Sequence, residues 1–217
     1  ELINCCWYFS DTNLSLISFF SCLSFSFLLS FSSLLQCEIS AAAASTSYQT
    51  LYYNQTLDHF NPTDSRRWSH RYLFSDEHWD GTGELINGCP GPILLYTGNE
   101  GSITGFWEAA GFMVEYLAPK WGALLVFPEE RYYGDSLPFG SDSFKAENLA
   151  FLTTEQVLED YVELISHLKS SLPEASSCPV VSFGGSYGGT LTTFLRSAYP
   201  AAVVGGLASS APVGYYD

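Results

Sequence analysis

Short apolar runs alternate with segments of helical pattern in the second half of the chain. Residues 93–96, 121–127 and 179–183 are mostly apolar, which is typical of strands buried on both faces of a sheet. Residues 106–117, between the first two runs, have a helical composition. Strands that alternate with helices predict a mostly parallel, doubly wound α/β sheet with right-handed crossovers.

The clearest helical pattern lies between the second and third runs. Thr153 and Gln156 form a candidate capping box at its start, and Pro173 marks its end. Spacings of three and four residues separate its apolar side chains, which are Leu158, Tyr161, Ile165, Leu168 and Leu172. We therefore expect one long amphipathic helix here.

Weaker patterns flank these elements. Asn61 to Asp64 reads Asn-Pro-Thr-Asp, a turn sequence, and strands are expected on both sides of it. Residues 190–199 predict a helix that stops before Pro200, and residues 203–208 predict a last strand.

The first part of the chain resembles a targeting segment. Residues 14–35 carry no charge, and the alanine run 41–44 offers Ala-x-Ala cleavage sites. We expect a leader with a signal peptide over residues 1–44 and the folded domain over 45–217, with an uncleaved signal anchor as the alternative. No Met opens the chain and no Lys or Arg precedes the apolar run, which indicates a fragment or a misplaced start.

Composition and charge narrow the class of protein. The chain has 217 residues, 47% of them hydrophobic, so a folded domain is expected rather than disorder. Its formal net charge is −15, with a pI near 4.4. Nucleic acid is excluded as an expected partner because there is no excess of basic side chains to neutralise phosphates. An acidic surface agrees with an extracellular or acidic compartment.

A Gly-x-Ser-x-Gly motif centred on Ser186 lies between a predicted buried strand and a predicted helix. In this context a sharp turn holds the serine hydroxyl above the sheet as a nucleophile. The backbone N–H of Tyr187 is then one expected oxyanion donor, and the 98–101 loop, at Asn99, is expected to supply the second. The alternative is a glycine-rich turn that only packs a strand against a helix.

A nucleophilic serine needs a base, and in this arrangement the order along the chain is Ser, then Asp or Glu, then His. No His follows Ser186, and Asp217 lies too soon after the last predicted strand to be the acid. The preceding histidines are not expected to be the base; for His167, on the helix face that carries Asp160 and Glu163, solvent exposure is expected. They are His59, His70, His78 and His167.

Several motifs together resemble the serine peptidases that include lysosomal Pro-Xaa carboxypeptidase and dipeptidyl peptidase II, over roughly residues 53–213. The family usually has Glu-His-Arg where this chain has Glu129-Glu130-Arg131, so a carboxylate replaces an imidazole. The matching segments are Gln-Thr-Leu-Asp-His-Phe-Asn at 55–61, Tyr-Thr-Gly-Asn-Glu-Gly at 96–101, Arg-Tyr-Tyr-Gly-Asp-Ser-Leu-Pro-Phe-Gly at 131–140, Leu-Thr-Thr-Glu-Gln at 152–156, the glycine-rich 184–189 and Ala-Ser-Ser-Ala-Pro at 208–212.

The resemblance implies an α/β-hydrolase, truncated here before the helical insertion and the last strands. It implies a serine-type exopeptidase that cleaves short peptides next to proline through an acyl-enzyme at Ser186, without a cofactor or metal. Peptides are the expected partners, with no stable membrane association after signal cleavage and a homodimer as one option for the full-length form. The expected location is the secretory pathway, then the lysosome or vacuole, or outside the cell.

This chain alone is expected to be inactive, because it would lack the acid and the base of the triad. Two alternatives remain open. A lipase or esterase could use the same serine motif, but it would not be expected to share the 57–60 and 131–134 segments. A non-catalytic fragment or binding protein would be excluded by a downstream Asp and His in the full gene.

Two cysteines and one sequon lie outside the leader. In hydrolases of this type the nucleophile strand neighbours the strand before the oxyanion loop, so strands that begin at Ile93 and Val180 should be adjacent. Cys89 and Cys178 would then precede them at one end, and a disulfide with a Cα separation of about 5.5 Å is expected, two free buried thiols being the alternative. Asn54 starts an Asn-Gln-Thr glycosylation sequon.

Overall fold

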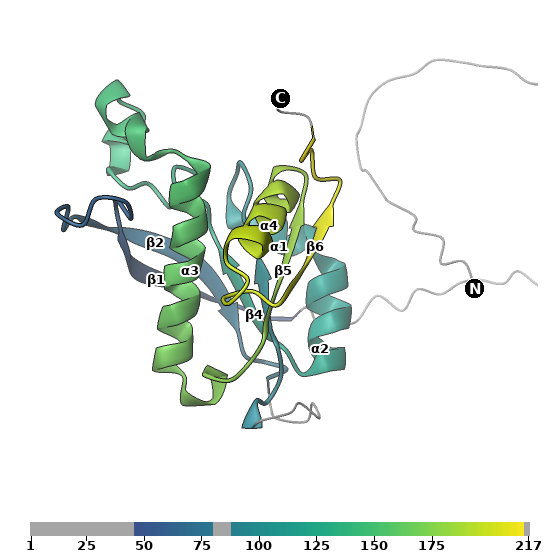
Figure 1. Ribbon diagram of the computed structural model, residues 1–217. Helices are drawn as coiled ribbons and strands as arrows, with labels where there is room; N and C mark the ends of the chain where they lie inside the picture. Colours follow the sequence, from purple (N-terminus) through teal and green to yellow (C-terminus); the bar gives the residue numbers. More distant parts are fainter. Residues whose placement is uncertain (1–45, 80–87, 215–217) are drawn as a thin grey trace, which may run out of the picture. The chain divides into compact units, whose positions relative to one another are not determined.

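A six-stranded sheet forms the centre of the computed structural model, which describes residues 46–79 and 88–214. The strand order is β1-β2-β4-β3-β5-β6 (Figure 1). The predicted leader lies outside the described residues. The strands are β1 (Gln49–Thr56), β2 (Arg67–Ser75), β3 (Ile93–Tyr96), β4 (Leu124–Pro128), β5 (Val180–Gly185) and β6 (Gly205–Ser209).

The last four strands of that order are parallel, as the alternating pattern predicts. Ile93 is paired with Val180, so the expected adjacency of the strands that begin at these residues is confirmed. The strands β1 and β2 form an antiparallel hairpin around the predicted turn, and β2 joins the sheet antiparallel to β4. The fold is thus the expected α/β-hydrolase type of sheet, with an antiparallel edge.

Helices cover both faces of the sheet, because side chains along each buried strand alternate in direction. Ile93 and Leu95 share one apolar cluster with the helices α3 and α4, whereas Leu94 packs with α1 and the helical segments that follow it. The helices are α1 (Ile103–Ala109), the π-helical η2 (Phe112–Leu117), α2 (Ala118–Trp121), α3 (Thr154–Ser171) and α4 (Tyr187–Ala198), and the 3₁₀ turns are η3 (Gly140–Asp142), η4 (Ala146–Phe151) and η5 (Pro173–Ala175).

The predicted helix at residues 106–117 is interrupted. It begins earlier, at Ile103, and α1 ends at Ala109, after which a π-helical turn and the short α2 complete the crossover. The break falls at Ala110, directly before Gly111, and glycine favours helix less than other residues do. Gly122 closes α2 with a positive φ of 56°, a conformation that favours glycine.

The long helix α3 has the predicted bounds, but only half of the predicted capping box forms. The Thr153 side chain accepts a hydrogen bond from the backbone N–H of Gln156 at 3.3 Å. The Gln156 side chain does not reach back; it accepts from the backbone N–H of His59 and donates to Asp58. Gln156 therefore ties the helix to the end of the β1–β2 hairpin. Within residues 46–79 and 88–214, the structure has no helix long and apolar enough to cross a membrane.

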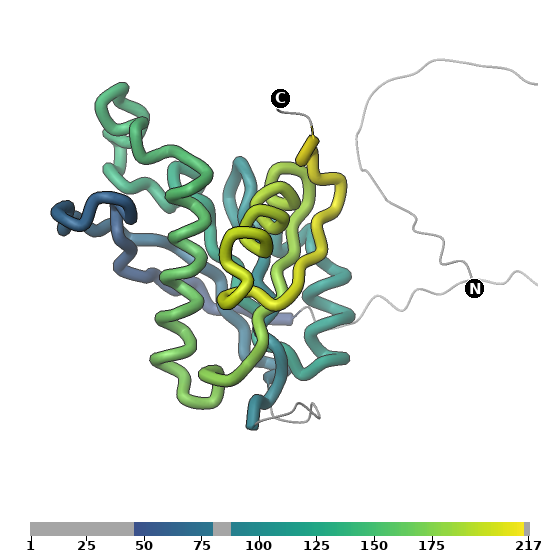
Figure 2. Tube along the Cα trace, in the orientation of Figure 1, coloured from purple at the N-terminus to yellow at the C-terminus, as the bar shows by residue number. Residues whose placement is uncertain are grey.

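The segment between β4 and α3 folds over the same end of the molecule as the turn of that hairpin (Figure 2). The guanidinium of Arg66, from the hairpin, lies 5.2 Å from the centre of the Phe151 ring, a cation–π contact. This segment therefore packs against the turn of the β1–β2 hairpin.

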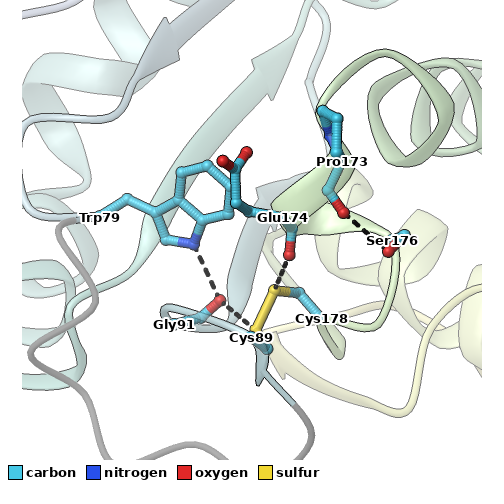
Figure 3. Close-up of a disulfide and its surroundings, with 7 residues drawn as sticks. All are labelled: Trp79, Cys89, Gly91, Pro173, Glu174, Ser176 and Cys178. Atoms are coloured by element: carbon cyan, nitrogen blue, oxygen red, sulfur yellow. Dashed lines mark hydrogen bonds between the residues drawn. A yellow bond between two sulfur atoms is a disulfide. The ribbon is translucent and has the colours of Figure 1, made fainter.

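Cys89 and Cys178 form a disulfide bond, with a Cα separation of 5.1 Å, just before β3 and β5 (Figure 3). Both cysteines are buried. Trp79 lies beside the bond and donates from its indole N–H to the backbone carbonyl of Gly91 at 3.1 Å. The bond joins the starts of two central strands that are far apart in the sequence.

Replacing both cysteines with alanine should lower the free energy of unfolding by about 2–4 kcal/mol, because the bond closes a long loop in the unfolded chain. The two cysteines are 89 positions apart. Denaturant unfolding of the double variant and the oxidised wild type measures the difference. Equal unfolding midpoints for these two proteins would contradict a stabilising bond.

Candidate active site around Ser186

Ser186 occupies a sharp turn between β5 and α4. Its φ of 54° and ψ of −125° are unusual for a residue with a side chain, and such strain persists only where surrounding contacts hold it. The Ser186 N–H donates to the backbone carbonyl of Ser209 at 2.9 Å, and its own carbonyl accepts from the N–H of Thr190. The Ser186 side chain itself is exposed. The strand, turn and helix therefore present the hydroxyl at the carboxyl end of the sheet.

Two glycines let the backbone approach closely around this turn. A Cβ on Gly188 would lie 2.5 Å from the carbonyl oxygen of Gly98 and 2.7 Å from that of Thr97. A Cβ on Gly184 would lie 2.2 Å from the carbonyl oxygen of Gly188. The helix α4 begins at Tyr187, earlier than the sequence pattern predicted, and its first turn packs closely against the end of β3.

A Gly188→Ala substitution should lower the free energy of unfolding by roughly 1–3 kcal/mol, since the added methyl would overpack rigid backbone. Gly185→Ala is the matched control, because a Cβ there would have nothing within 4 Å. Denaturant unfolding of both variants tests the prediction. Equal losses of stability in the two variants would contradict the close packing of Gly188.

The side chain of Asn99 links the loop after β3 to the serine turn. Its Oδ1 accepts from the backbone N–H of Gly188 at 2.7 Å, and its Nδ2 donates to the carbonyl of Gly185 at 3.1 Å. The amide side chain is therefore engaged in holding the turn. If Asn99 donates a hydrogen bond to the oxyanion, the donor must therefore be its backbone N–H. The oxyanion roles of the Asn99 and Tyr187 backbone N–H groups both stay predictions.

Glu130, where the family motif has histidine, is buried behind this turn with an exposed fraction of 2%. Its Oε2 has no hydrogen-bond partner among the described groups. Burial raises the pKa of Glu130 to about 8; an interaction with the Tyr187 side chain opposes this, and the negative charges of Glu100 and Asp160 add to it. Glu130 is therefore largely protonated at neutral pH.

The stability of the fold should fall as pH rises because of Glu130. Its pKa is raised in the folded state, so folding is most favourable when the carboxyl is protonated, and this advantage is lost as pH approaches 8. Relative to Glu130→Gln, the wild-type free energy of unfolding should drop by roughly 3 kcal/mol between pH 5 and 8. Denaturant unfolding at both pH values measures it. If the free energies of unfolding of the wild type and Glu130→Gln differ by the same amount at pH 5 and at pH 8, the raised pKa is contradicted.

The histidines have partners away from Ser186. His59 lies 2.8 Å from Asp160, and His70 is fully buried against the backbone carbonyl of Glu129. Burial lowers the pKa of His70. His78 contacts Thr46, and the ring of His167 packs 4.6 Å from that of Tyr53. None of these contacts places an imidazole as a base for Ser186.

The prediction that Asp160 lies on a solvated helix face is wrong: its exposed fraction is 1%. Arg131, fully buried, donates to it from Nε at 2.6 Å and from Nη2 at 2.7 Å. Arg131 is thus paired with α3 and not with the adjacent Glu130. The positive charge of Arg131 keeps the pKa of Asp160 below its usual value despite burial. The signal missed in the sequence is its spacing of three and four from Val157 and Leu164, which places Asp160 on the buried face of the helix.

A second buried pair fixes the start of the segment after β4. Glu129 is fully buried and accepts from Arg71 through both of its oxygens. The same carboxylate accepts from the backbone N–H groups of Ile103 and Asp135. These hydrogen bonds fix the position of Glu129, and they therefore also restrict the backbone of the next residue, Glu130.

Asn54, the predicted glycosylation site, is exposed on β1 at the edge of the sheet. Its backbone carbonyl accepts from Arg67 at 2.7 Å. Modification of its side chain stays a prediction.

The sheet order and the strained serine between β5 and α4 define the class: this is an α/β-hydrolase fold, with Ser186 at the turn where such a fold carries its nucleophile. An esterase from Pyrococcus furiosus has the same fold, with a TM-score of 0.51 and 14% identity over 78% of this chain and 53% of that one.

Within that class, the chain belongs to the serine carboxypeptidase S28 family, whose pattern it matches over residues 55–216. It is 49% identical to mouse lysosomal Pro-X carboxypeptidase over 81% of its own length, and 46% identical to the human protein of that name over 82%. It spans about a third of each relative, 34% in both cases. The expected family is confirmed.

Proposed function

We propose that this chain supplies the nucleophile of a serine exopeptidase that cleaves short peptides next to proline. The observation that carries the proposal is the exposed Ser186 held at a φ of 54° on a turn between β5 and α4, in a chain of the S28 family. The names of the relatives support the choice of Pro-Xaa bonds.

In the proposed reaction the Ser186 Oγ attacks the carbonyl carbon of the scissile bond and loses its proton to a base. The tetrahedral oxyanion accepts hydrogen bonds from the backbone N–H of Tyr187, at the first position of α4, and from that of Asn99. Collapse expels the amine, which takes the proton, and leaves an acyl-serine. Water then hydrolyses this ester and regenerates the hydroxyl.

The acid and the base of the triad are proposed to come from protein sequence beyond Asp217, since the described histidines are engaged elsewhere. The same reasoning predicts that the 217 residues alone do not turn over. We place the enzyme in the secretory route, with the lysosome or vacuole as its destination, because relatives are named for the lysosome.

Hydrolysis by the full-length protein tests the proposal. We expect cleavage of peptides that end in Pro-Xaa or begin with Xaa-Pro, and little cleavage of matched peptides in which alanine replaces the proline. Cleavage of simple esters without any of these peptides would favour an esterase. No hydrolysis of peptides or esters would favour a non-catalytic protein.

A further inference from the structure

A pocket of about 560 Å³ lies against the nucleophile turn. Glu100, from the loop after β3, and Glu130, from the segment after β4, both line it. Tyr187, the residue that follows Ser186, forms part of the same wall. Two carboxyl groups therefore face a space that begins one residue from the nucleophile.

The described part of the chain brings no positive group into this pocket. Its described lining has no Lys, Arg or His. Arg131, next to Glu130 in the sequence, is paired with Asp160, and Arg71 is paired with Glu129 and Asp135. Glu130 is left buried with an unpartnered Oε2, which is costly unless a ligand completes it.

We propose that this pocket binds a positively charged group of the peptide substrate, an ammonium or a guanidinium, with Glu130 as the residue that determines this preference. The proposal rests on the proposed peptidase function. A cation placed there would favour the ionised form of Glu130, and it would pair with the free oxygen of that side chain and with the exposed carboxylate of Glu100.

The remaining walls of the pocket suit the same ligand. Tyr133, Tyr187 and Phe194 contribute aromatic rings, and such rings attract ammonium and guanidinium groups. An anionic group would be repelled by the exposed carboxylate of Glu100 and would hold Glu130 in its neutral form, whereas an apolar group would leave the Glu130 oxygen without a partner. The charge could be the free amino terminus of the peptide or the side chain of a Lys or Arg residue.

Calorimetry on the full-length protein with Ser186→Ala measures binding without turnover. One arm compares Ala-Pro-Ala with N-acetyl-Ala-Pro-Ala, which tests the amino terminus. The other compares N-acetyl-Lys-Pro-Ala with N-acetyl-norleucine-Pro-Ala, which tests a side chain. We expect the charged member of at least one pair to bind roughly tenfold more tightly or better. Equal affinities in both arms would overturn the proposal.

Variants assign the preference to the pocket. Glu130→Gln keeps the shape and should reduce the preference to less than about twofold, and Glu130→His should remove or invert it. Glu100→Gln should reduce the preference for the charged peptide partly. Because Glu100 is exposed, this variant tests the pocket without changing a buried residue. Glu147→Gln, exposed on η4, is the matched control and should keep the full preference. A preference that survives both Glu130→Gln and Glu100→Gln would overturn the assignment.

The two proposals fail in different ways. If the wild-type protein hydrolyses neutral proline peptides but no charged peptide binds better, the pocket assignment is wrong and the peptidase function stands. If charged peptides bind better through Glu130 but no proline peptide is cleaved, the peptidase function is wrong and the pocket binds cations in another role.

Discussion

Replacing Ser186 with alanine should reduce kcat/KM of the full-length protein for proline peptides by about 10⁴ to 10⁶-fold, the range seen when the nucleophile of a triad is removed. In the proposed reaction the Ser186 hydroxyl oxygen forms the acyl-enzyme, and alanine has no such atom. The strained turn is held by backbone contacts, such as that from the Ser186 N–H to Ser209, which alanine keeps. Binding of substrate should therefore change far less than kcat.

Steady-state kinetics with one Pro-Xaa peptide measures this loss. Ser170→Ala is the control, because Ser170 is exposed on α3 and its hydroxyl only donates to the carbonyl of His167. We expect that variant to retain full activity. A Ser186→Ala protein with more than a few per cent of wild-type activity would mean that another group is the nucleophile.

Asp160→Ala should lower the free energy of unfolding by about 3–5 kcal/mol, the cost of breaking a buried ion pair from one side. The substitution leaves the guanidinium of Arg131 fully buried without its carboxylate, and it removes the nearer of the two carboxylate partners of His59. Arg131 would keep only neutral acceptors, the backbone carbonyls of Thr56, Leu57 and Phe151. Because one cluster joins the hairpin, the β4 segment and α3, its loss should affect the whole domain.

Denaturant unfolding near neutral pH tests this expectation. Asp142→Asn is the control, because its pair with Lys145 is exposed and surface pairs contribute little. The contribution of Asp160 should also depend on pH. Its pKa is lowered in the folded state, so the stabilisation is present above about pH 4 and is lost as pH falls further. Equal unfolding midpoints for the Asp160 and Asp142 variants would contradict the role of the buried pair.

The elements that the sequence predicted best are those with a strong local signal. The apolar runs became β3, β4 and β5, and the glycines around Ser186 marked the nucleophile turn because only glycine fits such close backbone contacts. The interrupted helix after β3 was missed, since the break at Gly111 competes with apolar spacing that continues through it.

The polar interior could not be predicted in the same way. The partners of each pair, Arg71 with Glu129 and Arg131 with Asp160, are far apart along the chain, and ordinary sequence rules place such residues at the surface. Only the folded topology brings them into pairs. The pocket beside Ser186 was not predicted, because Glu130 was noted in the sequence only as a departure from the family's usual Glu-His-Arg.

The most direct test of the central claim is covalent labelling of the native full-length protein with a fluorophosphonate, followed by mass spectrometry of its peptides. We expect a single adduct on Ser186, which forms in parallel with the loss of peptidase activity and which prior heat denaturation prevents. An adduct on a different serine, or complete inactivation with Ser186 unmodified, would contradict the central claim.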